Sequence, residues 1–109
     1  GHVDGVGTLL EHETLGAWDR LRFAIPYPLA RYVAKKGSIA IDGISLTVTE
    51  VADANEKDQW FEVGIIPTTL RETTLGQREP GDSVNLEVDV MAKYAERLAT
   101  FNPAEGATP

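Results

Sequence analysis

The chain has 109 residues and a formal net charge of −7, with 42% hydrophobic and 25% charged residues. These values are ordinary for a single globular domain, and the excess of acid argues against nucleic acid as a partner, because phosphate backbones are bound by clustered Lys and Arg. The chain has no cysteine, which excludes disulfides, a thiolate nucleophile and zinc–thiolate sites.

The hydropathy of the chain predicts where the protein is located, and its first residues predict how it was produced. No apolar run reaches the length of a membrane span and no signal-peptide pattern is present, so we expect no membrane partner and a cytoplasmic location. The chain opens on Gly1-His2 without an initiator methionine, from which we expect a fragment or a processed product.

The first third of the chain predicts two strands and a short helix. Residues 3–13 and 18–25 have the pattern of strands and are separated by a turn. Pro28 suits the first turn of a helix that Gly37 is expected to end. Three basic residues fall near the negative end of that helix dipole, namely Arg31, Lys35 and Lys36.

A central hairpin is predicted around Asp42-Gly43. Apolar residues alternate on both sides of this pair, which favours a type I′ turn because both of its central residues need positive φ. On the second strand Ser45 and Thr47 share the face opposite Leu46. Antiparallel sheets commonly have one solvated face, so the two hydroxyls by themselves indicate only a polar surface.

The next segments predict a strand, a short helix and a sixth strand. Residues 60–66 form a strand that Pro67 stops. Residues 69–72 fit a capping box, with Thr69 as the N-cap of a helix that ends before Gly76. Residues 83–89 then alternate cleanly as a strand.

Asp89 is placed to cap a last helix. Its apolar stripe, interpreted as a packing face, consists of Met91, Tyr94, Ala95 and Leu98. Residues 102–109 are small residues and proline for the most part, and predict a flexible tail. One domain over residues 1–101 is therefore expected.

Six short strands with turn signals between them predict an all-β antiparallel barrel or sandwich with two short connecting helices and a terminal helix. Closure is favoured because few strands carry the charges that protect an open edge. No side chain marks a reaction by itself. His2 and His12 are too far apart for a recognised metal pattern, while the turn explains Asp42 and the cap explains Asp89. Composition and residue patterns alone predict only a small acidic barrel with one polar face.

Four blocks of sequence resemble riboflavin synthase, in that family's order and spacing. They are residues 1–7 (GHVDGVG), 36–48 (KGSIAIDGISLTV), 66–76 (IPTTLRETTLG) and 81–89 (GDSVNLEVD). The resemblance matches the carboxy-terminal half of the family's chain. It implies a six-stranded Greek-key barrel that binds lumazine. In the family this barrel is preceded by a similar amino-terminal barrel and followed by a helix that assembles a homotrimer.

The resemblance also implies a reaction. The family is a transferase that dismutates two molecules of 6,7-dimethyl-8-ribityllumazine into riboflavin and 5-amino-6-ribitylamino-uracil, with neither metal nor cofactor. Each barrel holds one substrate, and the site forms where the first barrel of one subunit faces the second barrel of another. We therefore expect a half-site that binds lumazine or riboflavin and turns over poorly alone.

Three stretches of this sequence match the family's ligand contacts. The matching positions are Gly1, His2, Val3, Lys36, Ser45, Leu46, Thr47, Ile66, Pro67, Thr68, Thr69, Leu70 and Arg71. Four positions are candidates for catalysis, namely His2, Ser45, Asp42 and Asp89. His2 is the best general base among them, because histidine titrates near neutral pH.

Two other functions stay open. A non-catalytic antenna module on the same barrel would bind lumazine or flavin without turnover. A barrel that binds oligonucleotides is disfavoured by the net charge of −7 and by the lack of a stripe in which aromatics alternate with Lys or Arg.

Overall fold

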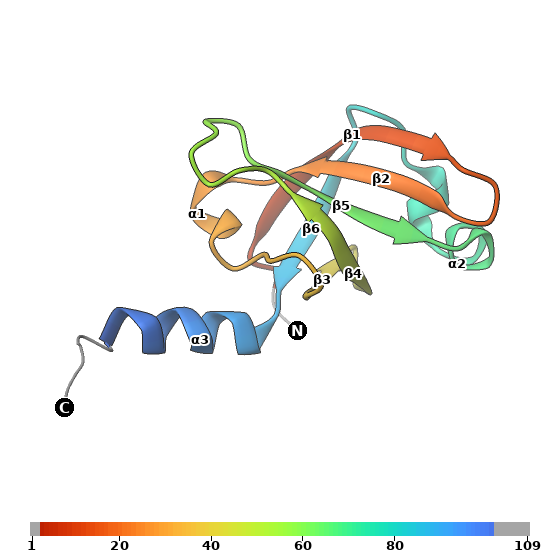
Figure 1. Ribbon diagram of the computed structural model, residues 1–109. Coiled ribbons are helices and arrows are strands. Elements are labelled where there is room, and N and C mark those ends of the chain that lie inside the picture. Colours follow the sequence, from red (N-terminus) through yellow and green to blue (C-terminus); the bar gives the residue numbers. More distant parts are fainter. Residues whose placement is uncertain (1–2, 102–109) are drawn as a thin grey trace.

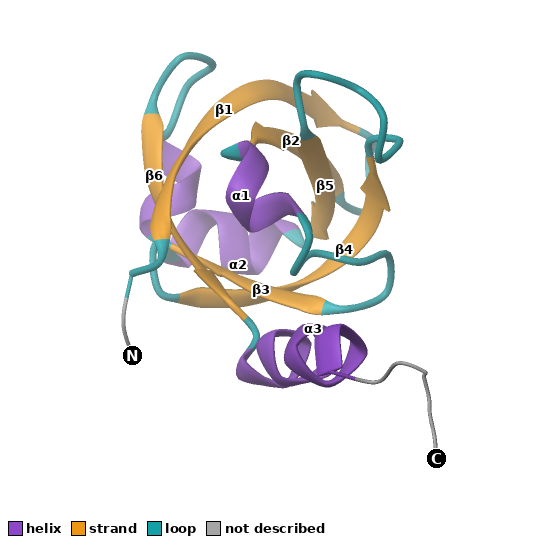
Figure 2. Ribbon diagram, turned by 90° about the vertical axis from the view of Figure 1, so that its left-hand side faces the viewer, coloured by secondary structure: helices purple, strands orange, loops and turns teal. Residues whose placement is uncertain are grey.

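The computed structural model describes residues 3–101, and its six strands close into one antiparallel barrel (Figure 1). In chain order the elements are β1 (Gly5–Thr14), β2 (Asp19–Ala24), α1 (Tyr27–Ala30), β3 (Ser38–Ile41), β4 (Ile44–Val51), β5 (Trp60–Ile65), α2 (Pro67–Glu72), the 3₁₀ helix η1 (Thr74–Gln77), β6 (Ser83–Val88) and α3 (Val90–Phe101). Helices α1 and α2 lie across the two openings of the barrel, and α3 lies outside its wall beside β3 (Figure 2). The expected all-β barrel is confirmed.

The strand order around the barrel is β1-β2-β5-β4-β3-β6. Strands β3, β4 and β5 are antiparallel neighbours in sequence order, and β6 returns to pair with β3, which is the Greek-key arrangement. Strand β1 pairs with β2 on one side and with β6 on the other, so no strand is left as an edge along the whole of its length.

The predicted hairpin between β3 and β4 is confirmed. Asp42 and Gly43 have φ values of 50° and 83°, the positive values that a type I′ turn requires. Ile41 is paired with Ile44 across the turn, and the register continues to the pair of Ser38 and Thr47.

Every strand contributes buried apolar side chains to the barrel interior, as the alternating pattern predicted. They are Leu9, Leu21, Phe23, Ile39, Ile41, Val48, Phe61, Val63, Ile65, Val84, Leu86 and Val88. At the centre the rings of Phe23 and Phe61 stack with centroids 5.4 Å apart, on strands where these two residues are register partners.

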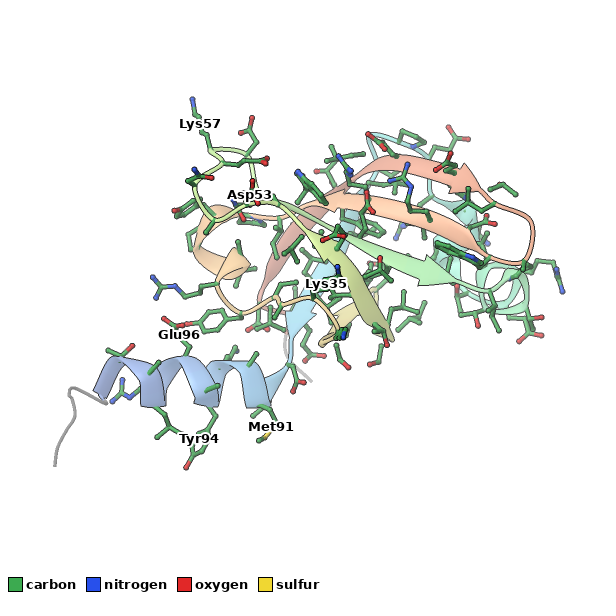
Figure 3. All side chains as sticks on the ribbon, viewed as in Figure 1. Lys35, Asp53, Lys57, Met91, Tyr94 and Glu96 are labelled. Carbon is green, nitrogen blue, oxygen red and sulfur yellow. The ribbon has the colours of Figure 1, made fainter. Side chains whose placement is uncertain are left out.

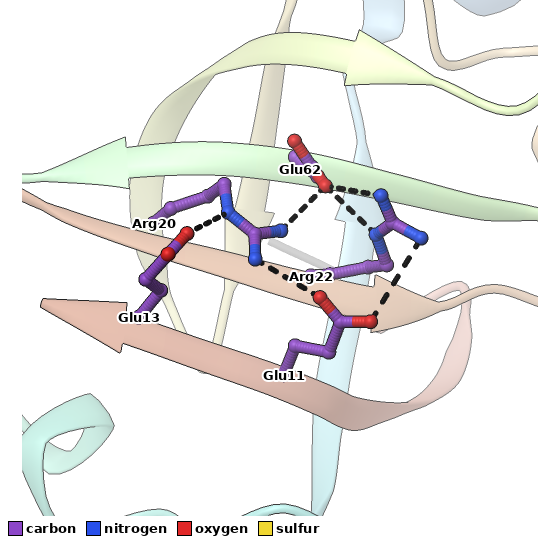
Figure 4. Close-up of polar contacts among 5 residues, drawn as sticks. All are labelled: Glu11, Glu13, Arg20, Arg22 and Glu62. Atoms are coloured by element: carbon purple, nitrogen blue, oxygen red, sulfur yellow. Dashed lines mark hydrogen bonds and ion pairs between the residues drawn. The ribbon is translucent and has the colours of Figure 1, made fainter. Parts of the chain in front are cut away.

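A cluster of charged side chains lies on the outer face of three adjacent strands (Figure 4). Oε2 of Glu62, on β5, accepts hydrogen bonds from Nη1 of Arg20 at 2.6 Å and from Nε of Arg22 at 2.7 Å, both on β2. Arg20 also donates to Glu11 at 3.0 Å and to Glu13 at 2.9 Å, both on β1. These contacts join β1, β2 and β5 through side chains as well as through their backbone ladders.

Helix α1 is shorter than the sequence predicted. It ends at Ala30, and the chain reaches β3 through turns in place of a longer helix. Lys36 N donates to Val48 O at 2.7 Å and Val48 N donates to Gly37 O at 2.8 Å. These backbone groups are therefore bonded to β4 and are not available for the hydrogen bonds of a longer helix. The expected helix end at Gly37 and the expected dipole role of its basic residues were wrong.

The predicted capping box before α2 was also wrong. The helix begins at Pro67, and Ile66 is its N-cap without a side-chain cap hydrogen bond. Thr69 therefore lies inside the helix. Pro67 decides the start, because its fixed φ is already helical and its missing N–H is not needed at the first helical position.

Helix α3 begins where predicted, with Met91 N donating to Oδ1 of Asp89 at 2.9 Å. The expectation that its apolar stripe packs was wrong within this chain, because the large apolar residues of the stripe are exposed. Met91 and Tyr94 point away from the barrel, whereas Glu96 points toward it (Figure 3). The predicted tail, residues 102–109, lies outside the described residues. No helix within residues 3–101 is long and apolar enough to cross a membrane.

Candidate functional site

Strand β4 presents a row of hydroxyls on the outside of the barrel. Ser45, Thr47 and Thr49 are alternate residues and all three are exposed. Leu46, between them, is half-buried and packs against the core. The predicted polar face is therefore present, while the side chain of Leu46 is turned to the core.

The backbone of the same segment is open on one side. Residues 44–47 of β4 are paired with β3. Within the described part of the chain, the pairing of β4 with β5 runs from Val51 to Val48 and does not extend to Ser45 or Thr47. A strand without a neighbour presents free N–H and C=O groups in a row. This edge can therefore bind a flat ligand that carries its own donors and acceptors.

The segment that follows β5 reaches the same end of the barrel. Because β4 and β5 are antiparallel, the end of β5 lies beside the first half of β4. Ile66, directly after β5, is 57% exposed, and α2 starts from it with the exposed Thr68 and the half-buried Thr69. A surface hollow of about 390 Å³ contains both Ile66 and Thr49 in its walls. The structure thus brings two predicted stretches together.

Lys36 lies beside β4 as well. It has a φ of 76°, and its backbone N–H is bonded to Val48 O, so its exposed side chain starts next to the hydroxyl row. The predicted residues Pro67, Leu70 and Arg71 belong to α2, where Leu70 is half-buried against the core and Arg71 is exposed.

The two candidate aspartates have structural partners. Asp42 Oδ1 accepts a hydrogen bond from Asn85 N at 2.8 Å, and its Oδ2 accepts from Arg78 Nη2 at 3.0 Å, so the turn is tied to β6 and to the end of η1. Asp89 caps α3 and also lines a hollow of about 610 Å³ between β3, β6 and α3, with Ser45 on its wall. Their roles in catalysis stay predictions.

The amino-terminal stretch is described only in part. Val3 precedes β1 and is 59% exposed, while Gly1 and His2 lie outside the described residues. The other histidine, His12, has a structural partner in Asp19, with 2.6 Å between His12 Nε2 and Asp19 Oδ2.

Two residues beside Ile66, Thr49 and Trp18, are not among the contacts predicted from the sequence. Thr49 continues the alternation of Ser45 and Thr47, so the sequence pattern already indicates that all three lie on one face. Trp18 comes from the loop between β1 and β2, and only the pairing of Asp19 with Ile65 places it here.

Comparison with known proteins identifies the family. The sequence profile described as the lumazine binding domain matches residues 1–89. The chain belongs to the lumazine-binding domain family. Among curated members, it is 52% identical over 98 residues to riboflavin synthase of Mycobacterium tuberculosis, which covers 90% of this chain and 48% of that protein. It is 46% identical over 101 residues to riboflavin synthase of Brucella abortus, covering 93% and 48%. This lumazine-binding domain thus spans about half the length of these relatives.

Solved structures of the LumP protein share the lumazine-binding barrel. The complex of LumP with 6,7-dimethyl-8-(1'-D-ribityl) lumazine superposes with a TM-score of 0.65 at 26% identity, covering 81% of this chain and 46% of LumP. The complex of LumP with flavin mononucleotide gives a TM-score of 0.66 at 26% identity, covering 83% and 48%. The resemblance to the riboflavin synthase family that the four sequence blocks indicated is confirmed.

Proposed function

We propose that this chain is the carboxy-terminal half of a riboflavin synthase and binds 6,7-dimethyl-8-ribityllumazine or riboflavin. The observation that carries the proposal is the open backbone edge of β4, with its hydroxyl row, beside Ile66. That arrangement occurs in a chain 52% identical over 98 residues to a riboflavin synthase.

The ligand's two parts suit the two kinds of group at this site. A lumazine ring has an imide edge of alternating N–H and carbonyl groups, which matches the backbone groups of Ser45 and Thr47 on the open side of β4. The ribityl chain carries several hydroxyls, for which Lys36 Nζ and the hydroxyls of Ser45 and Thr68 are suitable partners. Ile66 supplies an apolar contact for the ring face. The remaining predicted contacts are assigned by resemblance.

The proposed reaction needs two lumazines face to face. One molecule gives a four-carbon unit to the other, which leaves riboflavin and 5-amino-6-ribitylamino-uracil, so the atoms balance without a metal or cofactor. A methyl proton must be removed and a nucleophile must add to the neighbouring ring carbon. We assign the base role to His2, because histidine is the side chain best suited to general base catalysis near neutral pH, with Ser45, Asp42 and Asp89 as further candidates. Holding two substrates in register supplies much of the rate.

This barrel supplies one substrate site, so turnover needs a second barrel. The proposed partner is the amino-terminal barrel of the same enzyme, contributed by another subunit of a homotrimer in the cytoplasm. We expect the chain alone to bind ligand and to form riboflavin slowly or not at all. Addition of an amino-terminal barrel should restore turnover, which a non-catalytic antenna module would not show.

The test is a titration of 6,7-dimethyl-8-ribityllumazine with the purified chain, followed by the ligand's fluorescence anisotropy. A saturable rise at micromolar protein supports the proposal. In a second titration, with the oligonucleotide dT15 in place of lumazine, the anisotropy of the oligonucleotide should not change. A flat response to lumazine and to riboflavin, from a chain that is folded by circular dichroism, would overturn the proposal.

A further inference from the structure

Trp18 lies next to the proposed ligand site because of the register between β2 and β5. It is the last residue of the loop between β1 and β2, and Leu15 N donates to Trp18 O at 3.0 Å to close that loop. The following residue, Asp19, is the register partner of Ile65. Trp18 therefore comes beside Ile66, although the two residues are far apart in the sequence.

The indole ring has a defined place on the barrel surface. A Cβ atom added to Gly64 would lie 3.0 Å and 3.2 Å from two carbons of the six-membered ring of Trp18, so the glycine leaves room for the ring to lie close over β5. The contact still leaves 40% of Trp18 exposed. A large aromatic side chain is thus held on the outside of the barrel without being covered.

The exposed part of Trp18 belongs to the hollow that the proposed ligand face shares. The hollow of about 390 Å³ is lined by Trp18, Thr49 and Ile66, together with Ala17, Gly64 and Ile65. Thr49 continues the hydroxyl row of β4, and Ile66 begins the second predicted stretch. One surface therefore runs from Ser45 through Thr49 to the indole, and it offers both hydrogen-bonding groups and an aromatic face.

We propose that Trp18 is a further ligand-contact residue, whose indole packs against the fused ring system of the bound lumazine or flavin. This inference rests on the proposed function, since it assigns another contact to the same site. An electron-rich indole and an electron-poor pteridine or flavin ring are suited to offset stacking, which adds to the gain from the apolar area that it buries. A ribityl chain has no ring to stack and would find its partners on β4.

The experiment measures riboflavin affinity by fluorescence anisotropy for the full chain and three variants. Trp18→Ala should weaken binding about twofold to tenfold, which corresponds to about 0.5–1.5 kcal/mol of stacking free energy. Trp18→Phe keeps a ring in place and should restore most of the affinity. Trp60→Phe is the matched control, because Trp60 lies at the opposite end of β5 with Arg22 over its ring at 3.7 Å, and it should bind like the unsubstituted chain.

A second readout separates direct contact from a change in folding. Indole in contact with a flavin quenches its emission, so riboflavin bound to Trp18→Ala should be brighter than riboflavin bound to the unsubstituted chain. Thermal melts check that each variant is folded. If folded Trp18→Ala binds riboflavin with unchanged affinity and unchanged emission, the inference is overturned while the proposed function stands. If the unsubstituted chain binds neither riboflavin nor lumazine, the proposed function itself fails.

Discussion

Glu62→Gln probes the charged cluster on the outer face of β1, β2 and β5. The Glu62 side chain is only 10% exposed, and its Oε2 accepts hydrogen bonds from Arg20 and Arg22. Glutamine has nearly the same shape, so the substitution removes the charge and leaves the packing. The pKa of Arg20 is raised by its hydrogen bonds to Glu11 and then Glu13, so this guanidinium stays charged after the substitution.

The expected loss of unfolding free energy follows from the burial of the three groups. Breaking a fully buried ion pair costs about 3–5 kcal/mol. Here Arg20 and Arg22 are 21% and 29% exposed, and Arg20 keeps Glu11 and Glu13, so water and the remaining carboxylates compensate in part. We expect a loss of about 2–3 kcal/mol, which lowers Tm by about 8–12 °C for a domain of this size.

The assay is equilibrium unfolding in urea, followed by circular dichroism, together with a thermal melt. Glu13→Gln is the matched control, because the Glu13 side chain is 54% exposed and its single pair with Arg20 should contribute under about 1 kcal/mol. If Glu62→Gln loses no more stability than Glu13→Gln, the cluster does not stabilise the barrel and the reasoning is refuted.

Three further predictions concern the ligand face, a close contact and the last helix. Ser45→Ala should weaken lumazine binding by about 0.5–1.5 kcal/mol at an unchanged Tm, and equal affinity in an anisotropy titration would remove Ser45 from the site. Gly76→Ala would place a Cβ in steric overlap with the carbonyl oxygen of Leu70, so α2 and η1 must shift. Urea unfolding should show a loss of about 1–3 kcal/mol, and an unchanged midpoint would contradict the steric argument. The pKa of Lys93 is raised by its hydrogen bond to Asp4 at 2.6 Å, so from neutral pH up to the ordinary lysine range this contact holds α3, and its contribution is lost as the pH rises through the raised pKa. Between neutral and strongly alkaline pH the unsubstituted chain should therefore lose more stability than Lys93→Met, and parallel pH profiles would exclude the contact as a contributor.

The local sequence was sufficient to predict the structure wherever neighbouring residues decide the backbone conformation. The turn at Asp42-Gly43 depends on two φ angles that these residues tolerate, and the cap at Asp89 depends on one carboxylate and the next backbone N–H groups. Alternation gave the inward and outward faces of the strands for the same reason, because side chains of a strand point to opposite sides in turn. The resemblance in four blocks added the proposed ligand contacts, which no local rule contains.

Distant segments decided what local rules could not. The helix predicted after Pro28 ends at Ala30, since Lys36 and Gly37 pair with Val48 from the far side of the hairpin. The apolar stripe of α3 has helical spacing whether or not a partner covers it, so its sequence could not indicate that it is exposed on this barrel.

The sequence by itself determined the strands, the central turn, the polar face of β4 and the family. Only the tertiary structure decided which strands are neighbours around the barrel, and with them the meeting of Glu62 with its arginines and of Trp18 with Ile66. The physical reason is that strand pairing across a closed barrel is a property of the whole chain. Each strand is compatible with several neighbours by its own pattern, and the order with the best buried core selects among them.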